Sequence, residues 1–161
     1  MKFKVSSGLN IEATACGNSS DPLVILLHGG GQTRYAWGGT AEKLSQSGFY
    51  ALAIDLRGHG DSDWSEDGDY AIESYREDLL SIIKQIGKPA SLIGASLGGM
   101  ISLSTAGDKL YQDYCNALVM VDIGIYPNED GSYEIVKFMS SGSKGFESLE
   151  EASNDISYYL P

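Results

Sequence analysis

The sequence contains little cysteine, histidine or positive charge, and each shortage narrows the range of functions. Its two cysteines, Cys16 and Cys115, lie far apart, and neither belongs to a C-x-x-C pair. This spacing predicts free thiols rather than a disulfide framework, as is typical of a reducing compartment. The first residues also lack the apolar segment of about 7–15 residues that a secretory signal needs. We therefore expect a cytoplasmic protein.

Basic residues are scarce: the sequence has 11 Lys and Arg and 22 Asp and Glu, which gives a net charge of −11. Nucleic acids and anionic membranes are bound through basic surfaces, so the composition argues against both as partners. No apolar run approaches the roughly 20 residues of a membrane span. We interpret the acidic clusters at 61–69 and 147–155 as solvated surface and assign them no ligand.

Two common nucleotide-binding signatures are missing as well. No G-x-G-x-x-G follows the first long apolar run at 23–27, and the His-Gly-Gly-Gly sequence after it lacks the G-K-[ST] ending of a phosphate loop. A nucleotide-binding protein is thus a poor alternative. The sequence also predicts no metal site.

Aliphatic runs without alternation predict strands that are buried on both faces, as in a parallel sheet. Four such runs occupy residues 23–27, 49–54, 90–94 and 117–121, and helical patterns occupy 36–47, 73–86 and 97–106 between them. Residues 3–5 and 10–15 flank a Ser-Ser-Gly turn and predict an antiparallel hairpin. Together these elements predict an α/β fold with a doubly wound, mostly parallel sheet of about six strands.

The pattern changes after Pro127, where no further strand is predicted. Residues 133–139 could form a short helix, and Ser148 with Glu151 forms a capping box that starts another helix. We expect a core domain over 1–127 and the start of a helical cap over 128–161.

The most informative stretch is the G-x-S-x-G sequence formed by Gly94, Ser96 and Gly98. It follows a predicted buried strand and precedes a predicted helix, which is the context that a nucleophile elbow requires. The glycines leave space at a sharp turn that exposes the serine hydroxyl. In parallel sheets, ligand sites lie at the carboxyl ends of strands, where this turn falls.

In this order and at these spacings, the elements resemble the α/β-hydrolase superfamily. The resemblance rests on the His-Gly-Gly-Gly loop at 28–31, the Asp-Leu-Arg-Gly-His-Gly-Asp-Ser turn at 55–62, the elbow at 94–99 and the strand ending at Asp122. Within the superfamily the sequence looks most like bacterial esterases and non-haem haloperoxidase-like hydrolases.

The resemblance implies that Ser96 is the nucleophile, and that the backbone N–H groups of Leu97 and Gly30 form the oxyanion hole. It implies a small carboxylic ester, lactone or thioester as substrate, and no cofactor. A serine at this position, in place of aspartate, favours acyl transfer over the displacement chemistry of the epoxide hydrolase branch.

A serine nucleophile needs a base, and here the shortage of histidine matters. The family order is serine, acid, histidine, but His28 and His59 both precede Ser96. We expect His28 to hold the oxyanion loop by hydrogen bonding, and His59 to serve the turn that contains it. Asp122 is the only acid candidate in the family's order, although an aspartate at a strand end is commonly structural.

The simplest hypothesis is that these residues form the N-terminal part of a longer hydrolase. The catalytic histidine, the final core strands and the acid (unless Asp122 supplies it) would then lie outside this chain, and the 161-residue chain alone would be inactive. The strand near Asp122 would form an exposed edge, which we expect another chain or self-association to cover. The alternative is a catalytically inactive binding module with a hydrolase fold.

Overall fold

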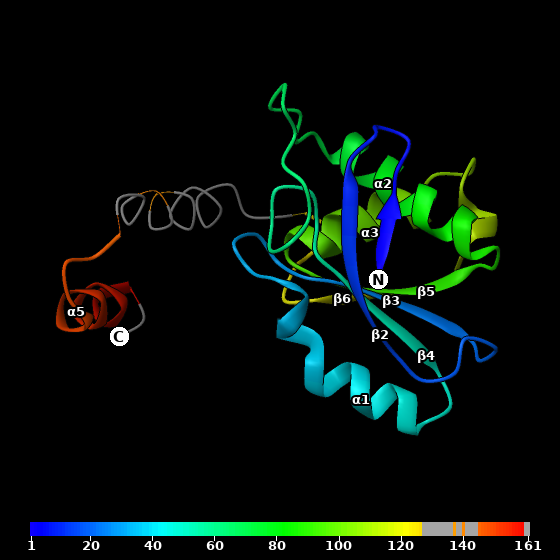
Figure 1. The fold of residues 1–161 in the computed structure, drawn as a ribbon, viewed down its shortest axis with the longest axis horizontal. Coiled ribbons are helices and arrows are strands. Elements are labelled where there is room, and N and C mark those ends of the chain that lie inside the picture. The colour runs from blue at the N-terminus through cyan, green and yellow to red at the C-terminus, as the bar shows by residue number, and fades with distance from the viewer. Residues whose placement is uncertain (127–136, 138–139, 141–144, 160–161) are drawn as a thin grey trace. The chain divides into compact units, whose positions relative to one another are not determined.

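A computed structural model of the protein describes residues 1–126, 137, 140 and 145–159 (Figure 1). The chain divides into two units, Met1–Ile125 and Tyr126–Pro161.

The first unit is built on a six-stranded sheet with the order β1-β2-β4-β3-β5-β6. The hairpin predicted near the N-terminus is present, and β2 also pairs antiparallel with β4, while β4, β3, β5 and β6 run parallel. The mostly parallel α/β sheet is therefore confirmed. The strands are β1 (Lys2–Lys4), β2 (Asn10–Cys16), β3 (Leu23–Leu27), β4 (Tyr50–Ile54), β5 (Ala90–Ala95) and β6 (Cys115–Val121).

Helices cover both faces of this sheet, α1 (Gly38–Gln46) on one side and α2 (Ile72–Ile86) with α3 (Leu97–Ala106) on the other (Figure 1). Each face has its own apolar core cluster. All residues of β3 and β4 are buried, because the two strands lie inside the sheet with side chains packed on both faces. The unbroken aliphatic runs in the sequence reflect this position.

The helix predicted over 36–47 is divided in the structure. A 3-10 turn at Arg34–Trp37 comes first, and α1 starts only at Gly38. Two consecutive glycines, Gly38 and Gly39, weaken the first helical turn, and hydrogen bonds from Arg34 to Asp55 fix the chain in the preceding turn.

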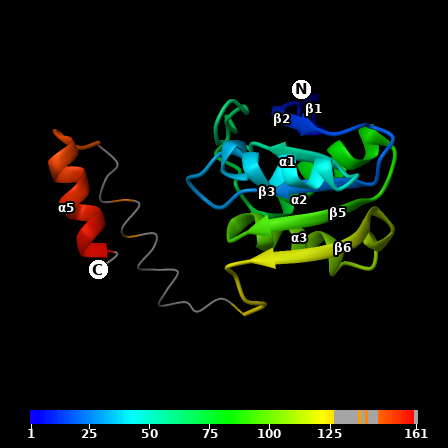
Figure 2. The same ribbon diagram turned by 90° about the horizontal axis from the view of Figure 1, so that it is seen from below.

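Strand β6 forms one edge of the sheet and pairs with β5 alone among the described residues (Figure 2). Val119 lies opposite Ile93, which packs against the core cluster on the α1 face. On that face, Val119 is 48% and Val121 is 38% exposed. The edge thus presents both unpaired backbone groups and aliphatic side chains to solvent.

In the second unit, the described residues include α5 (Leu149–Tyr159). The Ser148 hydroxyl accepts a hydrogen bond from the Glu151 N–H at 3.1 Å, and the Glu151 carboxylate accepts one from the Glu147 N–H at 2.7 Å. The predicted capping box is therefore formed, with its return bond one residue earlier than in the usual motif. The short helix predicted over 133–139 falls almost entirely outside the described residues.

Candidate active site

Ser96 occupies the turn between the end of β5 and the start of α3, with φ 45° and ψ −112°. A positive φ is unusual for a residue with a side chain and stores strain, which is common at functional sites. The Ser96 N–H donates a hydrogen bond to the Val121 carbonyl at 3.1 Å, which ties the turn to β6. Ser96 itself is exposed. The hydroxyl-bearing residue thus stands at the carboxyl end of the sheet on a rigidly held turn.

The two glycines of the motif are required by close backbone packing. A Cβ added to Gly94 would overlap the Gly98 carbonyl and lie 2.5 Å from the Gly99 nitrogen. A Cβ added to Gly98 would overlap the carbonyl oxygen of Leu27 and lie 2.6 Å from its carbonyl carbon. The first turn of α3 therefore rests directly on the backbone of β3 and β5, which is what makes the turn sharp.

The glycine loop after β3 lies beside Ser96. A Cβ on Gly29 would be 3.5 Å from the Ser96 Cβ, whereas a Cβ on Gly30 would have no atom within 4 Å. Within the described part of the chain, no hydrogen bond takes the N–H of Gly30 or of Leu97. The loop and the turn that adjoin the serine therefore each carry one backbone donor that no described residue engages.

His28 is fully buried and holds the loop. Its Nδ1 lies 2.7 Å from the Gly29 carbonyl, so Nδ1 carries the proton and donates it. Its Nε2 accepts a hydrogen bond from the Leu56 N–H at 3.0 Å. Burial lowers the pKa of the imidazole, and both ring nitrogens are occupied. This bears out the expected loop-holding role and leaves His28 with no free nitrogen to act as a base.

The lowered pKa of His28 predicts how stability depends on pH. The unfolded chain binds the proton near pH 6.5, while the folded chain binds it only at lower pH. The free energy of unfolding should hence be flat with respect to this group above pH 6.5 and fall below it, by at most about 1.4 kcal/mol per pH unit. Urea unfolding at several pH values, with NMR of the His28 ring, measures both effects.

The pH range above 7 is the internal control for this measurement, since His28 should contribute no slope there. Carboxylates add their own slope only at lower pH, near their pKa values of about 4. A His28 ring that gains its proton at or above pH 6.5 would contradict the assignment.

His59 is also engaged by the backbone. Its Nδ1 lies 3.0 Å from the Arg57 carbonyl, and its Nε2 accepts from the Gly31 N–H at 3.2 Å. Its ring centroid is 5.0 Å from that of His28. Within the described residues, neither histidine makes a hydrogen bond to Ser96, so the structure brings no base to the serine.

Asp122 follows the last residue of β6 with φ 53° and is exposed. It is next in sequence to Val121, whose carbonyl accepts the Ser96 N–H, so it adjoins the turn. No hydrogen bond in the described part of the chain joins it to either histidine. A serine, acid and histidine triad is therefore not assembled from these residues.

The turn after β4 depends on two buried ion pairs whose partners sequence reasoning missed. The first joins the Asp55 carboxylate to the guanidinium and the backbone N–H of Arg34, and Asp55 also accepts from the Asp61 N–H at 2.9 Å. A Cβ on Gly60 would overlap this carboxylate, so the turn needs glycine there. Arg34 had no sequence signal, because its partner lies 21 residues away.

The second pair joins Arg57 to Asp78 of α2 through two hydrogen bonds, at 2.6 Å and 2.8 Å. Arg57 also donates to the carbonyls of Asp69 and Ser74. The bond to Asp78 raises the pKa of the guanidinium. This pair fixes the turn after β4 to helix α2. The same turn is joined to the glycine loop by the hydrogen bonds of His28 and His59.

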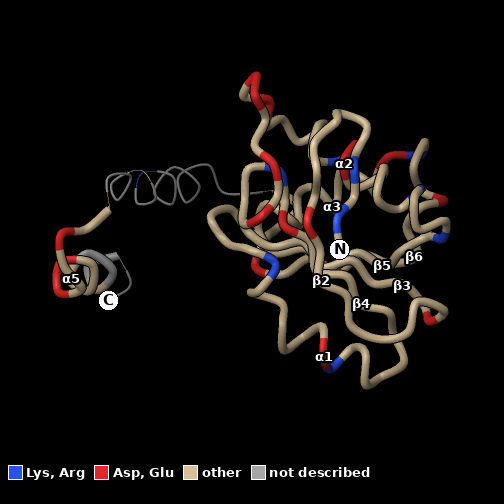
Figure 3. The backbone as a smooth tube through the Cα atoms, viewed as in Figure 1, with Lys and Arg blue, Asp and Glu red and all other residues tan. Residues whose placement is uncertain are grey.

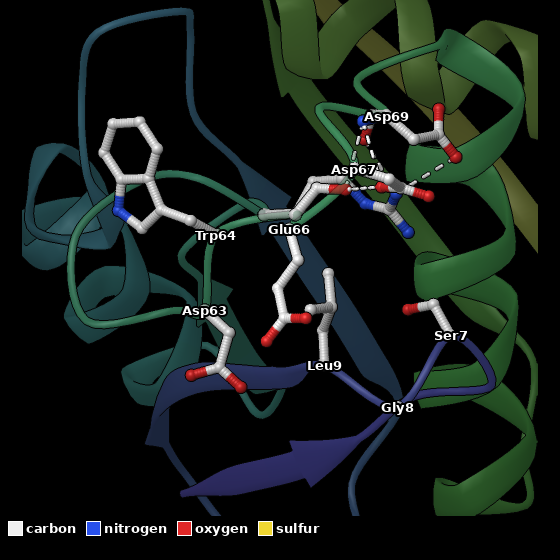
Figure 4. Close-up of a pocket in the computed structure, with 10 residues that line it drawn as sticks. Ser7, Gly8, Leu9, Asp63, Trp64, Glu66, Asp67 and Asp69 are labelled. Atoms are coloured by element: carbon white, nitrogen blue, oxygen red, sulfur yellow. Dashed lines mark hydrogen bonds and ion pairs between the residues drawn. The ribbon is translucent and has the colours of Figure 1, made fainter.

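The loop that joins β4 to α2 is rich in acidic residues (Figure 3). Between this loop and the β1–β2 turn lies a pocket (Figure 4). Trp64 and Asp69 stand on opposite sides of it (Figure 4). Neither Ser96 nor Gly30 lines this pocket, so the pocket is separate from the nucleophile elbow. Its lining residues are Ser7, Gly8, Leu9, Arg57, Asp63, Trp64, Ser65, Glu66, Asp67 and Asp69.

A strained serine between a parallel strand and a helix, with a glycine loop beside it, defines the class of the α/β-hydrolase fold. A family model described as alpha/beta hydrolase fold matches residues 22–146, and the chain belongs to this family.

Curated relatives include esterases. An esterase of Mycobacterium tuberculosis is 38% identical over 114 residues, covering 70% of this chain and 36% of its own length. Protein phosphatase methylesterase 1 of Bos taurus is 32% identical over 139 residues, covering 83% of this chain and 36% of its own length. The chain thus spans little more than a third of the length of these relatives.

Solved structures agree on the fold. A hydrolase from Pseudomonas aeruginosa PA01 gives a TM-score of 0.77 at 22% identity, over 97% of this chain and 57% of that one. Epoxide hydrolase A from Mycobacterium thermoresistibile gives 0.73 at 25% identity, over 84% and 44%.

The described residues contain neither a membrane-spanning helix nor a cluster of metal-binding side chains. None of their helices is both long and apolar enough to cross a membrane. No group of three or more His, Cys, Asp or Glu among them is arranged to hold a metal ion.

Proposed function

We propose that the protein is a serine hydrolase acting on a small carboxylic ester, lactone or thioester, with Ser96 as the nucleophile. The observation that carries this proposal is the strained turn at Ser96, beside which the N–H groups of Leu97 and Gly30 take part in no hydrogen bond with any described residue. The relatives named as esterases and methylesterases support ester hydrolysis. The serine at the elbow favours acyl transfer over epoxide opening, the activity named for one structural neighbour.

In the proposed reaction the Ser96 hydroxyl oxygen attacks the substrate carbonyl carbon while a base removes its proton. The carbonyl oxygen becomes an oxyanion held by the N–H groups of Leu97 and Gly30, each of which is worth about 100- to 1,000-fold in rate. The intermediate expels the alkoxide or thiolate, which takes the proton from the base. Water then attacks the acyl-enzyme by the same steps, which releases the carboxylic acid product and restores the Ser96 hydroxyl.

The described residues bring no base to Ser96, and Asp122 is the one candidate for the acid that they offer in the family's order. We propose that the histidine and, unless Asp122 serves, the acid come from polypeptide beyond these 161 residues, and that the chain alone is inactive. We further propose that this polypeptide, or a second copy of the chain, covers the β6 edge, where Val119 and Val121 are exposed. The free thiols of Cys16 and Cys115 favour a cytoplasmic location.

A second candidate function is a binding module that keeps the fold without catalysis. It is favoured by the two histidines, because both are occupied by backbone groups within the described part of the chain. Against it stands the strain at Ser96, which a module that only binds has no need to maintain.

A fluorophosphonate probe with intact-mass readout separates the two. The test compares the 161-residue chain with a longer protein that also includes the C-terminal part found in its relatives, called here the continued chain. On the continued chain we expect rapid labelling that Ser96→Ala abolishes. On the 161-residue chain alone we expect labelling at least about 1,000-fold slower, since the base is missing.

Ser104→Ala is the matched control, because Ser104 lies on the same helix α3 and, among the described residues, its hydroxyl accepts a bond from Arg76 alone. This variant should label at the unsubstituted rate. A continued chain that does not label at all would overturn the hydrolase and favour the binding module.

A further inference from the structure

The two histidines form reciprocal links between two loops. His28 belongs to the glycine loop and accepts from the Leu56 N–H on the turn after β4, at 3.0 Å. His59 belongs to that turn and accepts from the Gly31 N–H on the glycine loop, at 3.2 Å. With their rings 5.0 Å apart, each imidazole crosses to the other segment. The loop that carries Gly30 is therefore held from both ends.

The link through His59 requires one form of its ring. The Arg57 carbonyl can only accept, so the ring proton lies on Nδ1, which is 3.0 Å from it. Nε2 then has a free lone pair, which receives the Gly31 N–H. A protonated ring carries hydrogen on both nitrogens and cannot accept this bond.

Gly30 lies at the corner of a tight turn. The Gln32 N–H donates to the Gly29 carbonyl at 3.1 Å, and Gly31 has φ 72°, which fits the third position of a turn. The N–H of Gly31 is taken by His59, while that of Gly30 takes part in no hydrogen bond of the described chain. The peptide plane next to the free donor is thus fixed by the imidazole of His59.

We propose that His59 is a positioning residue that orients the Gly30 N–H toward the oxyanion, acting through its hydrogen bond with Gly31. This inference rests on the proposed function, because it assigns a purpose to the donor that the reaction would use. A purely structural role would only stabilise the fold. The proposed role also links the protonation state of the His59 ring to the direction of the Gly30 N–H.

The charged and titratable groups around this ring are known. His28 faces it from the glycine loop, while Asp55 and Asp61 belong to the same turn and are paired with Arg34. Arg34 forms ion pairs with both carboxylates, which share its single positive charge.

NMR of the 161-residue chain tests the link without requiring activity. As the pH is varied, the Gly31 and Gly30 amide signals should change together with the signals of the His59 ring, because a doubly protonated ring cannot accept the Gly31 N–H. His59→Phe keeps an aromatic ring beside His28 and should abolish the movement. Asp63→Asn is the control and should leave the movement unchanged. Asp63 is a titratable residue four positions from His59, but its carboxylate contacts Asn10 and not the glycine loop. Gly30 and Gly31 amide signals that do not change when the His59 ring signals change would overturn the proposal.

Fluorophosphonate labelling of the continued chain tests the catalytic consequence. His59→Phe should slow labelling of Ser96 by about 10- to 100-fold, the effect of a slightly misplaced group, while the chain stays folded and loses only the small stability of two hydrogen bonds. Labelling at the unsubstituted rate, or a slowing matched by loss of fold, would overturn the positioning role. If the unsubstituted chain does not label, the proposed function fails and the positioning role with it, while the NMR result still decides whether His59 is linked to Gly30.

Discussion

Replacing Arg57 by methionine is expected to lower the free energy of unfolding by about 3–5 kcal/mol. Arg57 is 3% and Asp78 is 5% exposed, so the substitution leaves a buried carboxylate without its cation. The carbonyls of Asp69 and Ser74 each lose the bond from Arg57 at the same time. Urea unfolding followed by circular dichroism measures the loss.

Two further variants show whether burial is the cause. Arg76→Met removes a more exposed arginine whose partner Asp108 lies 3.6 Å away, and should cost no more than about 1 kcal/mol. Adding Asp78→Leu to Arg57→Met removes both charges and should restore most of the stability. A loss for Arg57→Met no greater than that for Arg76→Met would show that the pair does not hold the turn.

Replacing Gly98 by alanine should destabilise the chain by about 3 kcal/mol, at the upper end for an overpacked site. The new Cβ would meet the Leu27 backbone, which cannot move aside as a flexible side chain can. Helix α3 must then shift away from β3, and Ser96 and Leu97 move with it. We therefore expect both a lower melting temperature and, on the continued chain, strongly reduced labelling of Ser96.

Gly39→Ala is the matched control for this substitution. Gly39 lies in α1, and a Cβ there would have no atom within 4 Å. Alanine is the better helix former, so stability should rise by about 0.5–1 kcal/mol. If Gly98→Ala were as well tolerated as Gly39→Ala, close backbone packing would not be what shapes the elbow.

The sheet could be predicted because its signals are local. Aliphatic runs such as 23–27 mark strands buried on both faces, and the glycines at 94 and 98 mark a turn with no room for a Cβ. The ion pairs could not be predicted, because Arg57 and Asp78 are 21 residues apart and no spacing rule joins an arginine of a turn to an aspartate of a later helix. The split start of the helix near Gly38 has the same origin, since it depends on the distant carboxylate of Asp55.

The candidate site was predictable in part. The motif placed Ser96, Leu97 and Gly30 on adjoining segments, and the structure brings these segments together. The link from His59 to Gly31 left no trace in the sequence, since a histidine that accepts from a backbone N–H has no spacing rule. Such contacts depend on two loops meeting at the edge of the sheet.

Strand β6 lies between the open edge and the serine turn, because the Val121 carbonyl accepts the Ser96 N–H. Whatever pairs with the free side of β6 binds the same strand that holds Ser96 in place. If an added strand shifts β6, its binding becomes thermodynamically linked to the binding of a ligand at Ser96. The factor by which an added strand changes the affinity for a ligand at Ser96 must equal the factor by which that ligand changes the affinity for the strand.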